Sequence, residues 1–369
     1  MLMNKSIISN HTVAIDYIKA IGIVFVVIGH YPVSIFNVFI PYAFHMPLFF
    51  FLGGILFNDK KKLTATIKKV FTHHFLYIAI TFIIIGVITN SLGHLLNLET
   101  NDIFNINPIQ MFKDAIKSNL HNNRFFLVAW FLFIYGTVAI LFKITFNLTH
   151  TKKLNQPLIL LIIGITCGFI GIDFIASKYE STKLFYLNNI SEILVGFMYF
   201  AIGFYTRQFI WLTLHPYAVI VFFLINYTLF QNNISHQMIM SWSSYPDGLL
   251  MHLFTSLSCI YSVFFFAEAL ASYGKYSLIS YIGQISKTIM SYHLLIFLLI
   301  DIVFYKLGLF ELKGLSTEKY SLFVSSYSWA IYVSLGIALP TTCKYIFDAI
   351  LKKTASIKFM FNKNDHTHL

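Results

Sequence analysis

Charged residues are scarce in this chain of 369 residues. Only 11% of the residues are Asp, Glu, Lys or Arg, whereas 57% are apolar and the mean hydropathy is +0.71. A water-soluble domain of this size cannot bury so large an apolar surface, and the charges gather between long apolar runs. The composition therefore excludes a soluble globular protein and predicts an all-α protein that crosses a lipid bilayer many times.

Cysteines and metal-ligand clusters are also lacking. The three cysteines lie apart inside apolar runs and have neither disulfide nor metal-ligand spacing: Cys167, Cys259 and Cys343. No second His or Cys stands three or four residues from His30, the histidine in the first apolar run. We therefore expect no metal and no other bound cofactor.

The net charge of +11 lacks the pattern of a nucleic-acid-binding protein. No basic stripe with interleaved aromatic residues occurs outside the apolar runs, and lysines that flank membrane spans explain the charge. We expect the lipid bilayer, and no nucleic acid, as a partner.

The apolar runs predict ten membrane spans joined in one domain over residues 1–345, followed by a basic cytoplasmic tail at 346–369. With both termini in the cytoplasm, sixteen Lys and Arg residues lie on the cytoplasmic side and eight lie outside. This asymmetry favours cytoplasmic termini. The predicted spans are 13–36, 42–57, 71–92, 125–146, 157–176, 188–206, 212–230, 249–271, 282–305 and 320–343.

The first span carries Asp16, Lys19 and His30 on one helix face. His30 follows Lys19 by eleven positions, which places the two residues about 20° apart around the helix and about 16 Å apart along it. Polar groups inside a membrane are costly, so this stripe indicates a functional site. The alternative is that Asp16 and Lys19 anchor the helix end at the headgroups and His30 is a hydrogen-bonded core residue.

Further polar side chains lie in later spans. In the predicted ninth span, Gly283, Ser286 and His293 fall within about 80° on one helix face, either as a second polar wall or as residues bonded within the bundle. Glu192 and Glu268 are the other candidates, because both lie inside spans.

A basic segment, DKKKLTATIKK, follows the second span at 59–69. It either attracts the phosphates of an acyl-CoA or serves as a topology signal held by anionic lipid. The candidate donor-binding residues are Lys60, Lys61, Lys62, Lys68 and Lys69, together with Lys19.

Four sequence features resemble the acyltransferase 3 family of membrane enzymes, and within it the subgroup similar to fucose O-acetylases. The first is the cation, ten residues and histidine of the first span. The second is FHMPLFF in the next span, which includes His45 and is followed by Gly53 and Gly54. The others are AWFLFIYG at 129–136, which contains Trp130, and YIGQISKTIMSYH at 281–293.

The chain departs from the family pattern at three places. Lys19 stands where many relatives have Arg, so a bidentate contact becomes a point-charge contact. Gly53 replaces a usual Ser, which removes a hydroxyl. Lys287 lies in a span that tends to be apolar in relatives.

The resemblance implies an O-acetyltransferase in the cytoplasmic (inner) membrane of a bacterium. Acetyl-CoA would be the donor substrate, and a cell-surface glycan or its lipid-linked precursor the acceptor. His30 would act as general base and Lys19, held by Asp16, would contact the donor. Supporting residues would be His45, Trp130, Ser286, His293, Glu192 and Glu268.

A transporter or flippase for a lipid-linked glycan is the main alternative function, and a polymerase of surface polysaccharide is a third, for which the loop at 93–124 is a poor candidate. The absence of an inverted repeat and the scarcity of broken helices weigh against the transporter.

Overall fold

The computed structural model describes residues 2–33, 40–99, 117, 120–150, 155–315 and 321–364; for 2–10 and 355–364 it describes the backbone only. These parts are helical and contain no strand, only a single antiparallel bridge between Ile239 and Ser244. The all-α fold predicted from the sequence is confirmed.

Eight helical segments of the described chain are long and apolar enough to cross a membrane. Two further apolar helices are shorter, α2 (Pro41–Ile55) and α11 (Pro216–Gln231). A multi-pass membrane protein is therefore confirmed, whereas the count of ten spans and the side of the termini stay predictions. The eight are α1 (Leu2–Gly29), α3–η1–α4 (Leu63–Val70, Phe71–Phe75, Leu76–Leu96), α6 (Ala129–Leu148), α7–η3–α8 (Gln156–Phe169, Ile170–Ala176, Ser177–Thr182), α9 (Phe185–Thr206), α12 (Gly248–Tyr273), α14 (Ser286–Lys306) and α15 (Ser328–Asn364).

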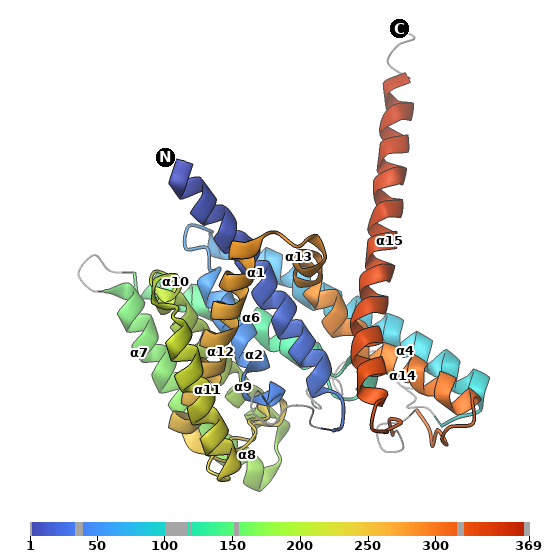
Figure 1. The fold of residues 1–369 in the computed structure, drawn as a ribbon, viewed down its shortest axis with the longest axis horizontal. Coiled ribbons are helices and arrows are strands. Elements are labelled where there is room, and N and C mark those ends of the chain that lie inside the picture. The colour runs from blue at the N-terminus through green and yellow to red at the C-terminus, as the bar shows by residue number, and fades with distance from the viewer. Residues whose placement is uncertain are drawn as a thin grey trace.

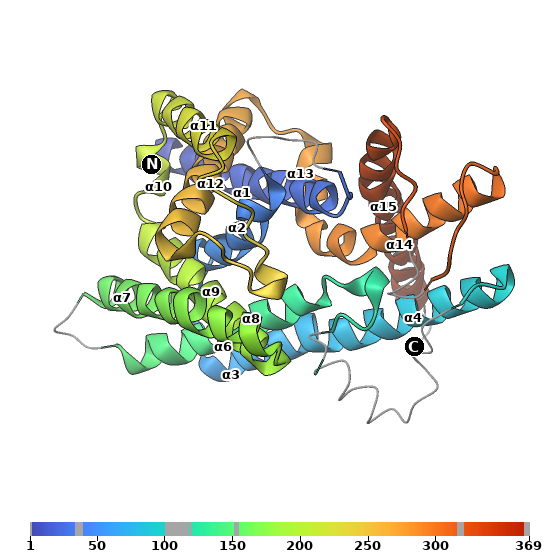
Figure 2. The same cartoon turned by 90° about the horizontal axis from the view of Figure 1, so that it is seen from below.

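The N-terminal end of α1 and the C-terminal end of α15 extend from the same end of the bundle (Figure 1). The short helix α8 and the C-terminal end of α1 lie at the opposite end (Figure 1). Viewed at right angles, α2 and α9 lie between a side formed by α1 and α12 and a side formed by α6 and α7 (Figure 2). The second helix is thus an interior element, and its residues from Phe44 to Gly54 are buried.

Glycines bring α2 and α9 into backbone contact. A Cβ on Gly54 would lie 2.0 Å from the carbonyl oxygen of Phe200, and a Cβ on Gly203 would lie 2.0 Å from that of Phe51. No other residue type fits at either position without moving a helix. The pair Gly53–Gly54 therefore admits a neighbouring helix.

The predicted span at 282–305 corresponds to α14 (Ser286–Lys306), but its first residues belong to a separate helix. Helix α13 (Ser277–Gln284) ends before Ile285, whose φ of −98° and ψ of 13° interrupt the helix, and α14 begins at Ser286. Gly283 lies on α13, where an added Cβ would be 1.9 Å from the carbonyl oxygen of Asp16. It therefore serves the contact between α13 and α1 and does not share a helix face with His293.

The lysine asymmetry predicts which end of the bundle faces the cytoplasm. Thr64 and Ser181 are both exposed and lie at opposite ends of the bundle, because α9 runs from beside α8 to Arg207, which contacts Asp59. In a chain without native cysteines, we expect Ser181→Cys to react with an impermeant thiol reagent outside intact cells and Thr64→Cys to be protected. Both should react after permeabilisation; labelling of Thr64→Cys in intact cells would contradict this topology.

The contact between α2 and α9 predicts unequal effects of two Gly→Ala changes. Gly54→Ala places a methyl group on the Phe200 backbone and should destabilise the protein by about 3 kcal/mol or more. Gly22→Ala meets only side-chain ends of Leu48 and Phe49, at 2.9 and 3.1 Å, and should cost about 1 kcal/mol or less. Thermal unfolding in detergent measures both, and equal midpoints would contradict the proposed importance of this contact.

Candidate active site

Three histidines from three helices converge near the C-terminal end of α1. His30 follows the last residue of α1, His45 lies on α2 and His293 lies on α14. The ring centroids of His30 and His293 are 4.9 Å apart in an edge-to-face arrangement. Tyr42 lies near both His30 and His45, and its ring centroid is 6.5 Å from that of His30 and 5.1 Å from that of His45. The structure therefore brings together three of the histidines that the sequence singled out.

Each of these imidazoles bonds a carbonyl of its own helix through Nδ1. The Nδ1 atom of His30 lies 2.8 Å from the Val26 carbonyl oxygen, and that of His293 lies 2.8 Å from the Met290 oxygen. His45 makes the same contact with Pro41. A carbonyl oxygen can only accept, so Nδ1 must carry the hydrogen in each ring. In the neutral ring Nε2 then keeps its lone pair and is the atom that can take a proton.

His30 lies between two cavities. The larger has a volume of about 250 Å³ and is also lined by Tyr42, His45 and Trp130. The smaller has about 80 Å³ and is lined by Arg124 as well as His30. His30 is partly exposed, whereas His45 and His293 are 2% and 0% exposed. Of the three histidines, His30 is therefore the most exposed and the one that lines both cavities.

The structure adds Arg124, His121 and Trp242 to the site, which sequence reasoning did not select. Arg124 lies on η2 (Arg124–Phe126), and His121 lies 4.5 Å from Trp242 by ring centroids. Both aromatic residues line the larger cavity. Burial lowers the pKa of His121 to about 4, so this ring is neutral at pH 7. The available signal was a Trp in a short polar segment, SWSSYPDG at 241–248.

Asp16 and Lys19 lie apart from these cavities. The Lys19 Nζ atom is 3.5 Å from Asp16 Oδ1, and Gln284 Nε2 donates to Asp16 Oδ2 at 2.9 Å. Their side chains remain 15% and 28% exposed for Asp16 and Lys19, and Lys19 lines neither cavity described above. The predicted polar stripe is thus divided into an ion pair beside α13 and a histidine beside the cavities.

Glu192 holds a turn instead of lining the larger cavity. The carboxylate accepts a bond from Asn188 Nδ2 at 3.2 Å, and the same Nδ2 donates to the Ser241 carbonyl at 3.0 Å. Asn188 Oδ1 in turn accepts a bond from Ser243 Oγ at 2.6 Å. The three side chains of this network are buried, and their bonds fix the turn that carries Trp242.

The two remaining candidates lie elsewhere. Glu268 is half-buried on α12 near His11 of α1. Ser286 is the first residue of α14, two turns before His293, and is half-buried. Neither lines the two cavities beside His30.

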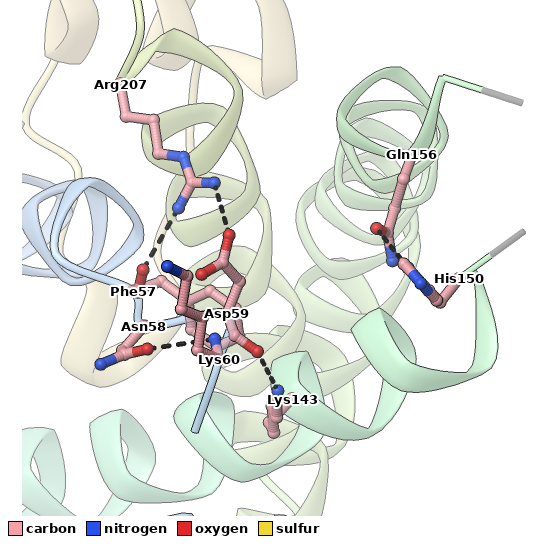
Figure 3. A network of polar contacts seen from close by, with 8 residues as sticks. All are labelled: Phe57, Asn58, Asp59, Lys60, Lys143, His150, Gln156 and Arg207. Carbon is pink, nitrogen blue, oxygen red and sulfur yellow. Dashed lines mark hydrogen bonds and ion pairs between the residues drawn. The ribbon is translucent and has the colours of Figure 1, made fainter. Parts of the chain in front are cut away.

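The basic segment adjoins a polar junction that includes Asp59 and Arg207 (Figure 3), at the C-terminal end of α9. Arg207 pairs with the Asp59 carboxylate at 3.3 Å and donates to the Phe57 carbonyl at 3.2 Å. Lys143 donates to the Asp59 carbonyl at 2.8 Å. These contacts fasten the chain after α2 to α6 and α9. The predicted donor-binding lysines are exposed, except for Lys61, which is half-buried: Lys60, Lys61, Lys62, Lys68 and Lys69.

Lys287 has a structural partner. Its Nζ atom donates to the His73 carbonyl at 2.9 Å and lies 3.8 Å from the Tyr77 ring centroid. His73 belongs to the π-helical turn η1, where the regular backbone pattern is interrupted. Lys287 thus ties α14 to this turn. Within the described ranges, no three His, Cys, Asp or Glu side chains are arranged to hold a metal ion.

Comparison with protein-family models finds one match over nearly the whole chain. A model described as an acyltransferase domain matches residues 12–346. Comparison with curated proteins and with solved structures finds no match. The matched range includes the three histidines, the Asp16–Lys19 pair and both cavities beside His30.

Proposed function

The chain belongs to the acyltransferase 3 family, and from this premise we propose that it is an O-acetyltransferase in the inner membrane of a bacterium. It would move an acetyl group from cytoplasmic acetyl-CoA to a hydroxyl of a cell-surface glycan or of its lipid-linked precursor. The observation that carries this proposal is His30, a histidine of fixed tautomer that lines two cavities inside an apolar bundle. This is the group that transfer to a hydroxyl requires.

The reaction needs one base and one route for a proton. Nε2 of His30 takes the proton of the sugar hydroxyl while the hydroxyl oxygen forms a bond to the thioester carbonyl carbon. The carbon–sulfur bond then breaks, and the proton on His30 passes to the leaving thiolate, which gives an ester and free CoA. Nδ1 stays bonded to the Val26 carbonyl throughout, so the ring keeps its orientation.

Neighbouring residues assist this chemistry in different ways. Arg124 lines the small cavity beside His30, where a guanidinium would stabilise the negative charge on the tetrahedral intermediate. His293 packs its ring against His30 and acts as a positioning residue. The apolar residues around them keep water from the thioester, which it would otherwise hydrolyse.

The donor would enter from the end that carries the basic segment. Exposed lysines such as Lys60 and Lys62 attract the nucleotide phosphates. Lys19 lies about 16 Å from His30 along α1, a span that the extended pantetheine arm can bridge. In this proposal Lys19 contacts the donor and also pairs with Asp16.

The general-base role predicts the effect of His30→Asn. Asparagine can still donate to the Val26 carbonyl but has no nitrogen that accepts a proton at neutral pH. Transfer of radiolabelled acetyl groups from acetyl-CoA to surface glycan should fall by about 10²–10⁴-fold with the protein still in the membrane.

A matched control for His30→Asn is His252→Asn. His252 is 1% exposed on α12 and lines neither cavity beside His30. We expect much smaller loss of transfer per folded molecule in this variant. Transfer at the normal rate in His30→Asn would remove His30 from the mechanism.

Variants of the Asp16–Lys19 ion pair should separate the effect of Lys19 on stability from its effect on donor binding. Lys19→Gln leaves the Asp16 carboxylate with the Gln284 bond alone, so stability should fall by about 1 kcal/mol for this partly exposed pair. Adding Asp16→Asn should restore the thermal midpoint, because no unpaired charge remains. The KM for acetyl-CoA should stay raised in the double variant and be near normal in Lys19→Arg.

Lys306→Gln is the control, since it removes the same charge from an exposed site at the C-terminal end of α14 that lines neither cavity beside His30, and it should leave the KM for acetyl-CoA unchanged. If the double variant regained both stability and a normal KM for acetyl-CoA, Lys19 would be only the partner of Asp16.

A further inference from the structure

A third cavity lies on the other side of the turn that carries Trp242. Its volume is about 420 Å³, within the size range of small-molecule sites. Three aromatic rings line it, those of Tyr179, Phe185 and Trp242, together with Glu180 and Lys183. These residues come from α8, the start of α9 and the turn after α11.

Trp242 is exposed but held rigidly. The turn is closed by two backbone bonds between Ile239 and Ser244, at 3.0 and 3.1 Å. Ser243 adopts a φ of +43°, a left-handed conformation that its surroundings must enforce, and its Oγ atom bonds Asn188. The indole is nevertheless 46% exposed. A fixed, uncovered aromatic surface of this kind indicates a binding site.

The same turn joins this third cavity to the larger of the two cavities beside His30, called the histidine cavity below. Trp242 lines both, Met240 and Ser241 line the histidine cavity, and Ser243 and Ser244 line the third. The indole therefore forms the wall between the two. A ligand in the third cavity would lie next to the cavity that His30 lines.

We propose that the third cavity binds a pyranose ring of the acceptor glycan, an inference that rests on the proposed function. The C–H face of a sugar ring packs on aromatic rings such as Trp242, which excludes water from both surfaces. Glu180 accepts bonds from ring hydroxyls and Lys183 donates to them. One charge of each sign suits a neutral sugar. Binding in the third cavity would place the next sugar of the glycan toward His30.

Glu192 becomes a positioning residue in this arrangement. Through Asn188 it holds the Ser241 carbonyl and the Ser243 hydroxyl, and so it fixes the indole between the two cavities. This role accounts for a buried carboxylate that the transfer step itself does not use.

Substrate kinetics of the full-length protein in detergent micelles test the proposal. The probes are radiolabelled acetyl-CoA and short oligosaccharides released by mild acid from de-O-acetylated surface glycan of the same cells. Trp242→Ala should raise the KM for oligosaccharide about tenfold and leave the KM for acetyl-CoA unchanged. Trp242→Phe, which keeps a ring, should show a smaller rise.

Two further variants separate a local effect from a general one. Glu180→Gln changes an exposed side chain without disturbing packing and should also raise the KM for oligosaccharide. Trp329→Ala removes an indole that is 39% exposed on α15 and lines none of the three cavities, so it should leave that KM unchanged.

The outcomes distinguish the two proposals. If the unmodified protein acetylates the oligosaccharides but neither Trp242→Ala nor Glu180→Gln raises the oligosaccharide KM, the sugar subsite is wrong and the proposed function stands. An equal rise in Trp329→Ala would likewise overturn the subsite. If the unmodified protein transfers no acetyl group to them, the glycan acceptor itself is wrong, and the subsite falls with it.

Discussion

The close backbone crossing of α2 and α9 is the constraint on which the site depends. Gly54 and Gly203 remove the side chains that would separate the two helices, and each faces a carbonyl of the other helix. The crossing holds α2 in the interior, which places His45 beside the cavity that His30 also lines. From the other end, α9 begins at α8 and carries Asn188, which fixes the turn of Trp242. One helix pair thus connects the histidines to the proposed acceptor end.

Polar groups in this apolar interior are arranged by local bonds to backbone carbonyls. His30, His45 and His293 each bond a carbonyl of their own helix through Nδ1, so their tautomers are set before any substrate arrives. Lys287 likewise donates to a carbonyl of η1, and Lys143 donates to a carbonyl in the turn between α2 and α3. The charged pair of Asp16 and Lys19 instead lies near the contact with α13, where Gln284 completes its bonding. The Asp16–Lys19 ion pair and the proposed base His30 therefore lie at different positions along the first span.

The sequence predicted the all-α membrane fold and the residues His30, His45 and His293, because apolar runs and intramembrane histidines are visible in one dimension. It could not predict that α13 ends at Gln284, since Ile285 is an ordinary helix residue and the close approach of Gly283 to the Asp16 carbonyl exists only in the folded chain. Arg124, His121 and Trp242 were missed because they lie in connecting segments. Only folding brings these segments over the end of α1. Glu192 was selected because it lies inside a span, but its tie to Asn188 and the distant turn at Ser241 has no sequence signal.

Glycan analysis of cells with and without this protein tests the central claim most directly, because acyl transfer and glycan export change different properties. Proton NMR of the purified surface glycan reports ester acetate, while its yield and chain length report export. The proposed transfer to a sugar hydroxyl predicts loss of ester signals with yield and chain length unchanged. Loss of surface glycan with its ester content intact would contradict this account and favour a flippase.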